Sequence, residues 1–436
     1  MPLSRGKGND YERFERDRAM GPVQIILSIV FAILGTVLSI FASDISPPND
    51  GDLRLPEVAV RYEDNAYYSL ARIQMYLYEP TGNPGLLQKH LSGARWNERF
   101  VRDILYRNEK ALRYFDEAAG KPRFQDPTVA DYADPSFDAI LSFRDMARVS
   151  SLRAALLFRR GREEEALTEA LEIVENGQKV QDSQGSVVHY ALAADMKNVG
   201  LGRIRQIAQS TSLSPEVLMS YVKKLEKYKQ NEEGLKKAFK HEYGFLVWAI
   251  DEVNSGHLKS EVGGTIEPLK THRFYFKPNK TKSLFGDFLR SQIENVDVPC
   301  GFRTVREVKR LTPSSMPQWI ITENLAGRIL YDIAMPRYAA TIHETRCEDD
   351  FSVSATQVLL AARAYKMETG QYPASLDDLV PRYMDDIPDD PFDGKTLRYS
   401  AEQKVIYSVG MDLVDSGGRE GQRGAQTGDH VVRIHF

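Results

Sequence analysis

The chain has only two cysteines, Cys300 and Cys347, and His343 lies four residues before the second. At this spacing His343 and Cys347 would lie on one face of a helix, and imidazole and thiolate are both zinc ligands. Two ligands are half of a zinc site, however, and no CxxC or HxxxH partner completes it. Two alternatives stay open for the cysteines. They form a disulfide, worth about 4 kcal/mol through loop closure in the chain-entropy model, or they are two buried free thiols.

The short motifs of common catalytic sites are missing from the sequence. No GxSxG, HExxH, P-loop or Rossmann pattern occurs, and His343 with Glu344 lacks the second histidine of a zinc peptidase. A lone GxG, at Gly200 and Gly202, falls in a helical stretch and indicates a packing position. The aspartates of residues 377–390 suit helix caps and turns better than paired catalytic carboxylates. We therefore predict a protein that is not an enzyme, with an enzyme whose catalytic residues are scattered along the chain as an alternative.

An apolar segment near the N-terminus indicates how the chain is placed relative to a membrane. Residues 23–42 carry no ionisable side chain, and twenty helical residues, at about 1.5 Å each, span the roughly 30 Å hydrocarbon core of a bilayer. We predict a transmembrane helix over residues 22–43; a cleaved signal peptide, the alternative, has a shorter apolar core. Five Lys and Arg residues precede the run and two follow it within twenty residues. This bias predicts that residues 1–21 are cytoplasmic and that the bulk lies outside the bacterial inner membrane.

The remaining chain divides into three predicted parts. Residues 44–56 form a polar linker, residues 57–323 an extracytoplasmic helical domain, and residues 324–436 a long helix followed by a small α+β module. The formal net charge is −4, and the lysines of residues 223–240 alternate with glutamates, which is typical of a solvated helix face. We therefore expect no nucleic-acid partner.

Helical periodicity is strongest between residues 137 and 255. Residues 148–160 and 163–179 predict two helices that form an αα-hairpin, with Gly161 at the turn and small alanines where they cross. The spacing of Gly161, Ala166 and Ala170 resembles a tetratricopeptide repeat, but only one copy occurs. The pattern thus predicts stacked helix pairs rather than a regular solenoid. Near the end, a helix is expected over residues 351–369, followed by a hairpin of strands at 397–400 and 404–409.

The C-terminal segment ETGQYPASLDDLVPRYMDDIPDDPFDGKTLRYSAEQKVIYSVGMDLVDSGG resembles the globular end of the major pseudopilin of type II secretion systems. With the helical middle and the NLAGRIL segment, the tail also resembles large membrane-anchored bacterial proteins, which implies no activity. The pseudopilin resemblance implies a calcium site in the last loop, to which Asp412, Asp415 and Asp429 would supply carboxylates. Leu413 replaces the glycine usual in that family, so the alternative is a solvated Gly- and Asp-rich tail.

The other end of the chain departs from the pseudopilin pattern. Gly21 is followed by Pro22 rather than phenylalanine, and Ile26 stands where pseudopilins have a glutamate. The chain is therefore not expected to polymerise. The sequence favours a mainly α, single-pass membrane protein that acts as an extracytoplasmic scaffold or interaction protein of the cell envelope. Its partners would be the membrane and an unidentified envelope protein, with no cofactor other than the calcium considered above. An accessory component of a type II secretion or pilus-like system and an envelope enzyme are the two alternatives.

Overall fold

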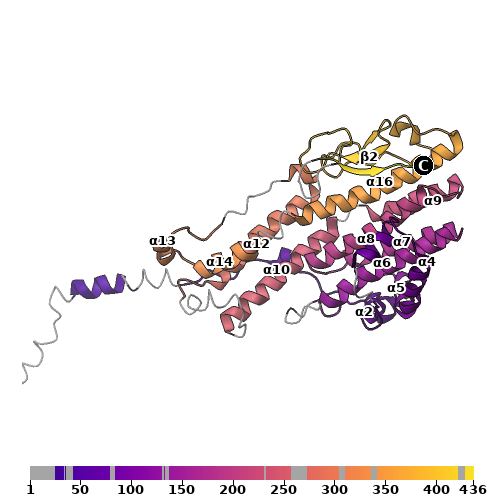
Figure 1. Cartoon of the computed structure of the whole chain (residues 1–436). Coiled ribbons are helices and arrows are strands. Elements are labelled where there is room, and N and C mark those ends of the chain that lie inside the picture. The colour runs from indigo at the N-terminus through magenta and orange to yellow at the C-terminus, as the bar shows by residue number, and fades with distance from the viewer. Residues whose placement is uncertain are drawn as a thin grey trace, which may run out of the picture.

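The computed structural model describes residues 25–33, 35, 43–78, 84–129, 132, 137–229, 232–256, 273–303, 310–334, 341–420 and 428–436. These residues form a mainly helical body with a small antiparallel sheet of three strands near the C-terminus (Figure 1). The predicted class, mainly α with a small sheet at the C-terminal end, is confirmed at this level.

The predicted membrane segment is described only in part. Residues 25–33 are helical, and seven of their large apolar side chains are exposed. Most of the rest of residues 22–43 lies outside the described residues, as does the whole of the predicted cytoplasmic tail. Within the described part of the chain, no helix is both long enough and apolar enough to span a bilayer.

The first half of the body is a set of packed helices in which α6, α7 and α8 each contact the other two. The predicted hairpin is present as α6 and α7, and Gly161 at its turn has a φ of +75°. Gly200 lies in α8 where a Cβ atom would come within 2.6 Å of the carbonyl oxygen of Ala170 on α7, so the lone GxG is a packing position. The helices are α2 (Tyr67–Ile73), α3 (Pro84–Leu91), α4 (Glu98–Arg107), α5 (Glu109–Ala119), α6 (Phe137–Arg159), α7 (Glu163–Gln181) and α8 (Val187–Ala208).

One long helix expected from the sequence is in fact two. The apolar pattern of residues 96–119 predicts a single helix, but α4 ends before Asn108 and α5 begins after it. The Asn108 side chain is buried and pairs with the backbone of Tyr78, accepting from its N–H at 2.8 Å and donating to its carbonyl at 3.0 Å. These two hydrogen bonds satisfy the buried amide group of Asn108 at the point where the helix breaks, and no local sequence pattern predicts them.

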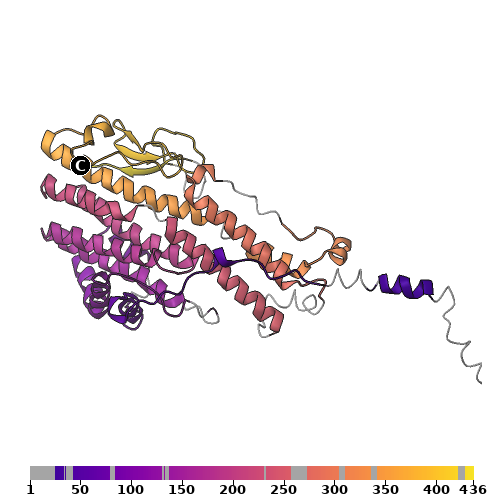
Figure 2. The same cartoon turned by 180° about the vertical axis from the view of Figure 1, so that it is seen from behind.

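The second half of the chain is organised around α16 (Thr341–Thr369). This helix packs against α8 and α9 on one side and against β2, β3 and η7 on the other, as Figures 1 and 2 show. Contact on both sides explains why it lacks a continuous polar stripe. The other elements of this half are α9 (Pro215–Leu225), η4 (Glu226–Tyr228), α10 (Glu232–Ser255), α12 (Pro278–Glu294), η5 (Asn295–Asp297), η6 (Cys300–Phe302), α13 (Met316–Ile321), α14 (Leu325–Ala334) and η7 (Leu376–Leu379).

Three short strands close the C-terminal end in the order β1-β2-β3. The predicted hairpin corresponds to β1 (Arg398–Ser400) and β2 (Val405–Ser408), and β3 (His430–Arg433), which the sequence pattern did not predict, pairs antiparallel with β2. The largest apolar core combines side chains of α7, α8, α9, α16 and this sheet. It therefore includes residues from both sides of position 323, the predicted boundary between the helical domain and the C-terminal part. A second core lies among α2 and α4–α8, and a third among α10, α12 and α14.

Candidate functional site

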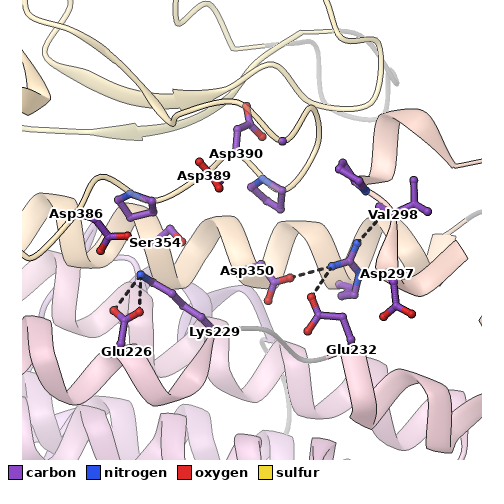
Figure 3. Close-up of a pocket in the computed structure, with 15 residues that line it drawn as sticks. Glu226, Lys229, Glu232, Asp297, Val298, Asp350, Ser354, Asp386, Asp389 and Asp390 are labelled. Atoms are coloured by element: carbon purple, nitrogen blue, oxygen red, sulfur yellow. Dashed lines mark hydrogen bonds and ion pairs between the residues drawn. The ribbon is translucent and has the colours of Figure 1, made fainter.

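A cleft of about 340 Å³ opens where α16 passes between the start of α10 and the loop of residues 386–394. In Figure 3 this loop lies above α16, while Glu226 and Glu232 reach toward the same helix from below. The lining is dominated by charged side chains from four separate stretches of the chain. They are Glu226, Lys229, Glu232, Asp297, Arg346, Asp350, Asp386, Asp389 and Asp390.

The lining has seven carboxyl groups and two basic side chains, and two of the carboxyl groups, Asp297 and Asp390, are paired with Lys236 and Arg398 from outside the lining. Asp386 and Asp389 are exposed at the rim, and Asp297, whose side chain is 60% exposed, pairs with Lys236 at 2.7 Å. A concave surface lined by one sign of charge attracts ligands of the opposite sign. The exposed carboxylates of Asp386 and Asp389 therefore give the rim of the cleft a negative charge.

Arg346 organises the inner wall of the cleft. Its guanidinium lies 3.2 Å from Asp350 Oδ2 and 3.5 Å from Glu232 Oε1, and it donates to the carbonyl oxygen of Val298 at 3.2 Å. Arg346 and Asp350 are on successive turns of α16, whereas Glu232 begins α10 and Val298 follows η5. One guanidinium thus holds three elements at fixed positions, as its fork of donors allows.

Asp350 is the cleft residue with the largest change in acidity. Burial raises its pKa to about 7; Arg346 opposes this rise, and the neighbouring carboxylate of Asp349 adds to it. A carboxyl group that titrates near neutral pH in a cleft is a feature of acid–base sites. Here the carboxylate of Asp350 accepts a hydrogen bond from Arg346. The two side chains form a structural ion pair in the wall of the cleft.

The two cysteines hold the loop of residues 386–394, which covers the cleft, in place. Cys300 and Cys347 form a disulfide with an S–S distance of 2.02 Å, which joins η6 to α16. The N–H of Cys300 donates to the carbonyl of Pro391 at 3.0 Å, and the N–H of Gly301 donates to that of Phe392 at 2.9 Å. The cysteines therefore act on the cleft indirectly, by tying the loop of residues 386–394 to α16.

Asp390 shapes the same loop from within. It is fully buried; one carboxylate oxygen accepts from the Ser408 hydroxyl at 2.7 Å, and the other pairs with Arg398 at 2.8 Å. Burial raises the pKa of Asp390, and the hydrogen bond from Ser408 opposes that rise. This carboxylate thus belongs to the scaffold of the C-terminal module, while Asp386 and Asp389 are left to face a ligand.

The three predicted calcium ligands are placed differently from the expectation. Asp412 accepts from the N–H of Gly428 at 3.0 Å, Asp429 from that of Gly418 at 2.7 Å, and Asp415 likewise accepts a backbone N–H. The described residues include all three carboxylates, and their oxygens do not come together within 4.8 Å. The structure uses these side chains to shape the last loop, and it does not assemble them into one metal site.

A different group could hold a divalent cation. Ligand atoms of Glu344, Glu348 and His430 lie within 4.8 Å of one another, with His430 Nδ1 at 3.8 Å from Glu348 Oε1. The His430 ring is stacked on Phe392 at a centroid distance of 4.9 Å. Burial raises the pKa of Glu348, a rise that His430 opposes and Glu344 reinforces. The group links α16 to β3.

A second group of acidic side chains is paired with a basic side chain, Arg153. Asp116, Glu169 and Glu172 also bring carboxylate oxygens within 4.8 Å, but Arg153 donates to Asp116 at 2.9 Å and to Glu169 at 2.5 Å. Burial and the charge of Glu169 raise the pKa of Glu172 to about 7. The guanidinium compensates this cluster, which is therefore a structural ion-pair network.

A larger cavity, of about 600 Å³, lies between the segment of residues 50–59 and α10. His241 lines it and places Nε2 2.9 Å from the carbonyl oxygen of Val129; burial lowers the pKa of His241. Residues 130, 131 and 133–136, next to this lining, lie outside the described part of the chain. The acidic cleft is therefore the better-defined candidate.

Sequence reasoning did not single out the cleft. One signal was present, because the run of Arg346, Glu348, Asp349 and Asp350 places four charges directly before the apolar residues of α16. No family model matches the chain, and neither a curated protein nor a solved structure matches it. The resemblance of the C-terminal segment to the major pseudopilin therefore depends on its sequence motifs.

Proposed function

We propose that this protein is a single-pass, membrane-anchored scaffold of the cell envelope that holds a positively charged protein segment in its acidic cleft. The observation that carries this proposal is the exposure of two aspartates, Asp386 and Asp389, at the rim of a cleft lined by seven carboxyl groups, of which the other five are paired with basic side chains of the body. A segment rich in Lys or Arg would place its charges at Asp386 and Asp389 on the rim. Such complementarity gives specificity and a fast association rate more than high affinity.

The proposed anchor is the segment of residues 22–43. Its support is the apolar run without ionisable residues and the exposure of seven large apolar side chains within residues 25–33. The excess of Lys and Arg before the run supports a body that lies outside the inner membrane. An extracytoplasmic body also suits the disulfide, because such bonds persist in oxidising compartments.

The second candidate is an accessory role in a type II secretion or pilus-like system. It is favoured by the motifs of the C-terminal segment and by the order of its elements, a long helix, a short 3₁₀ helix, a turn and a small sheet. The two proposals differ in the ligand that they require. A scaffold binds a basic segment through the cleft, whereas an accessory component binds a secretion protein through the exposed surface of the module.

Peptide binding tests the first proposal. The full chain, purified in detergent, is titrated with two labelled decapeptides, one alternating Lys with Ser and the other Glu with Ser, and binding is followed by fluorescence anisotropy. We expect binding of the Lys peptide only, weakened by added salt because the contacts are exposed. Asp389→Lys is expected to weaken binding about 2- to 30-fold, from the loss of one exposed charge pair and its replacement by repulsion.

The matched control is Glu402→Lys, which makes the same charge change on an exposed residue of the turn between β1 and β2. It is expected to leave the affinity unchanged. Equal weakening by Asp389→Lys and Glu402→Lys would mean that net charge, rather than the cleft, attracts the peptide. Absence of binding to the wild-type chain would refute the proposal and leave the secretion role as the better candidate.

A further inference from the structure

Three large apolar side chains on α13 are turned away from the body. Met316, Ile320 and Ile321 have exposed fractions of 75%, 68% and 76%. Trp319, on the same helix, instead packs on the core of α10, α12 and α14, and its Nε1 donates to the carbonyl of Pro313 at 2.8 Å. Grouped apolar side chains of this size on a surface mark a place where something apolar is bound.

This helix is firmly attached to the start of α12. The Tyr275 hydroxyl donates to the carbonyl of Ile320 at 2.9 Å. Two residues after Ile321, the carboxylate of Glu323 pairs with both Lys277 and Lys280, the residues just before and within the first turn of α12. The exposed side chains therefore keep a fixed position relative to that turn.

The same turn of α12 also holds the chain where it leaves the proposed anchor. Asp44 accepts from the N–H of Asn279 at 2.7 Å and from that of Lys280 at 3.2 Å, and the Asn279 side chain donates to the carbonyl of Ile45 at 2.8 Å. Lys277, at the N-cap position, provides no side-chain cap of its own. Asp44 therefore caps a helix that begins more than 230 residues later in the sequence.

We infer that α13 lies on the membrane surface, with Met316, Ile320 and Ile321 inserted into the interfacial layer of the bilayer beside the anchor. The inference rests on the proposed anchor, because Asp44 is the first residue after residues 22–43. One turn of α12 fixes both Asp44 and α13, so the exit from the bilayer and the apolar surface occupy the same end of the body. Figures 1 and 2 show α13 at the end of the body that faces the helical residues 25–33.

The surroundings of α13 suit a lipid surface rather than a protein core. Arg310 precedes α13 in the chain, and its side chain is 80% exposed. Its Nε lies 3.9 Å from Oδ2 of Asp332 on α14. Helices that lie in the interface combine apolar side chains on one face with basic residues that reach anionic headgroups. Tyr275, whose hydroxyl group binds the carbonyl of Ile320, is of a residue type enriched at that depth.

Quenching by brominated lipid tests the position of α13. The full chain is placed in nanodiscs of phosphatidylcholine and phosphatidylglycerol in a 3:1 ratio, with or without bromine on the acyl chains. Three single substitutions, Leu27→Cys, Ile320→Cys and Tyr106→Cys, carry a bimane label, and the native disulfide stays oxidised. We expect brominated lipid to reduce the fluorescence at positions 27 and 320 by about half or more. Tyr106, which is 78% exposed on α4, is the control and should be unaffected.

The outcomes separate this inference from the proposed anchor. Quenching at position 27 without quenching at position 320 would overturn the inference and leave the anchor standing. Absence of quenching at both positions would overturn both. If the label at position 320 is shielded from lipid and from aqueous iodide alike, a protein covers α13 and the inference is wrong. Asp44→Ala, added to Ile320→Cys, should reduce the quenching at position 320 and leave that at position 27 unchanged, because it releases the body from the anchor.

Discussion

Replacing Lys197 by Met is expected to lower the free energy of unfolding by about 3–5 kcal/mol. Lys197 Nζ lies 2.7 Å from Asp349 Oδ2, and neither side chain has any exposed surface. The ammonium group also donates to Gln181 Oε1 at 3.0 Å and to the carbonyl of Tyr228 at 3.3 Å. The pair thus joins α8 to α16 in the interior of the protein, where water cannot replace a lost partner.

The expected size follows from this geometry. At 2.7 Å and an effective dielectric constant of about 20, Coulomb's law gives an attraction of about 6 kcal/mol. Most of this attraction offsets the cost of removing two ions from water, so the intact pair contributes little net stability. Removing Lys197 alone takes away the attraction but leaves the desolvated carboxylate of Asp349, and this uncompensated charge accounts for the loss.

Urea unfolding of the full chain in detergent, followed by circular dichroism, measures the effect. The double substitution Lys197→Met with Asp349→Leu should recover more than half of the loss, because it removes both charges and keeps the volume. Arg162→Met breaks an exposed pair with Glu165, whose side chain keeps 57% of its exposure, and should change nothing measurable. A loss below about 1 kcal/mol for Lys197→Met, or no recovery in the double variant, would refute the reasoning.

Two further predictions concern packing and pH. Gly200→Ala should destabilise the protein by about 1–3 kcal/mol in the same urea assay, because the new Cβ atom would come within 2.6 Å of the Ala170 carbonyl oxygen. Gly202→Ala is the control: the nearest atom to its Cβ would be 3.8 Å away, so this substitution should be neutral or stabilising. Burial raises the pKa of Glu242 from 4.5 to about 7, so the folded state binds more protons than the unfolded state between these values and stability falls as pH rises through them. Glu242→Gln should remove up to about 3 kcal/mol of that fall between pH 4.5 and 7, and an unchanged slope would contradict the assignment.

Local patterns in the sequence were enough to predict much of the helical framework. Gly161 at the turn, alanines at the crossing and acidic residues in the first turn of α7 are all short-range signals, and the hairpin of α6 and α7 follows from them. Two further short-range signals are glycine directly after a helix, as at Gly370 with a φ of +77°, and serine at the start of a capping box, as at Ser375.

Features that depend on contacts between distant parts of the chain were not predicted. From the sequence, the last helix is expected to start near Phe351, after a stretch in which five of the ten residues 341–350 are charged. In the structure α16 begins at Thr341, and three of those charged residues, Arg346, Asp349 and Asp350, are buried; Asp349 pairs with Lys197, 152 residues away in the chain. The cleft is missed for the same reason, since its carboxyl groups come from stretches that only the fold brings together.

Labelling of single cysteines in intact spheroplasts tests most directly that the chain is anchored in the inner membrane with its body outside. Ser4→Cys and Ala59→Cys lie on the two sides of residues 22–43, and Ala59 is exposed. With a membrane-impermeant maleimide, we expect labelling at position 59 in intact spheroplasts and at position 4 only after permeabilisation. Labelling at position 4 in intact spheroplasts, or recovery of the chain in the soluble fraction, would contradict the account.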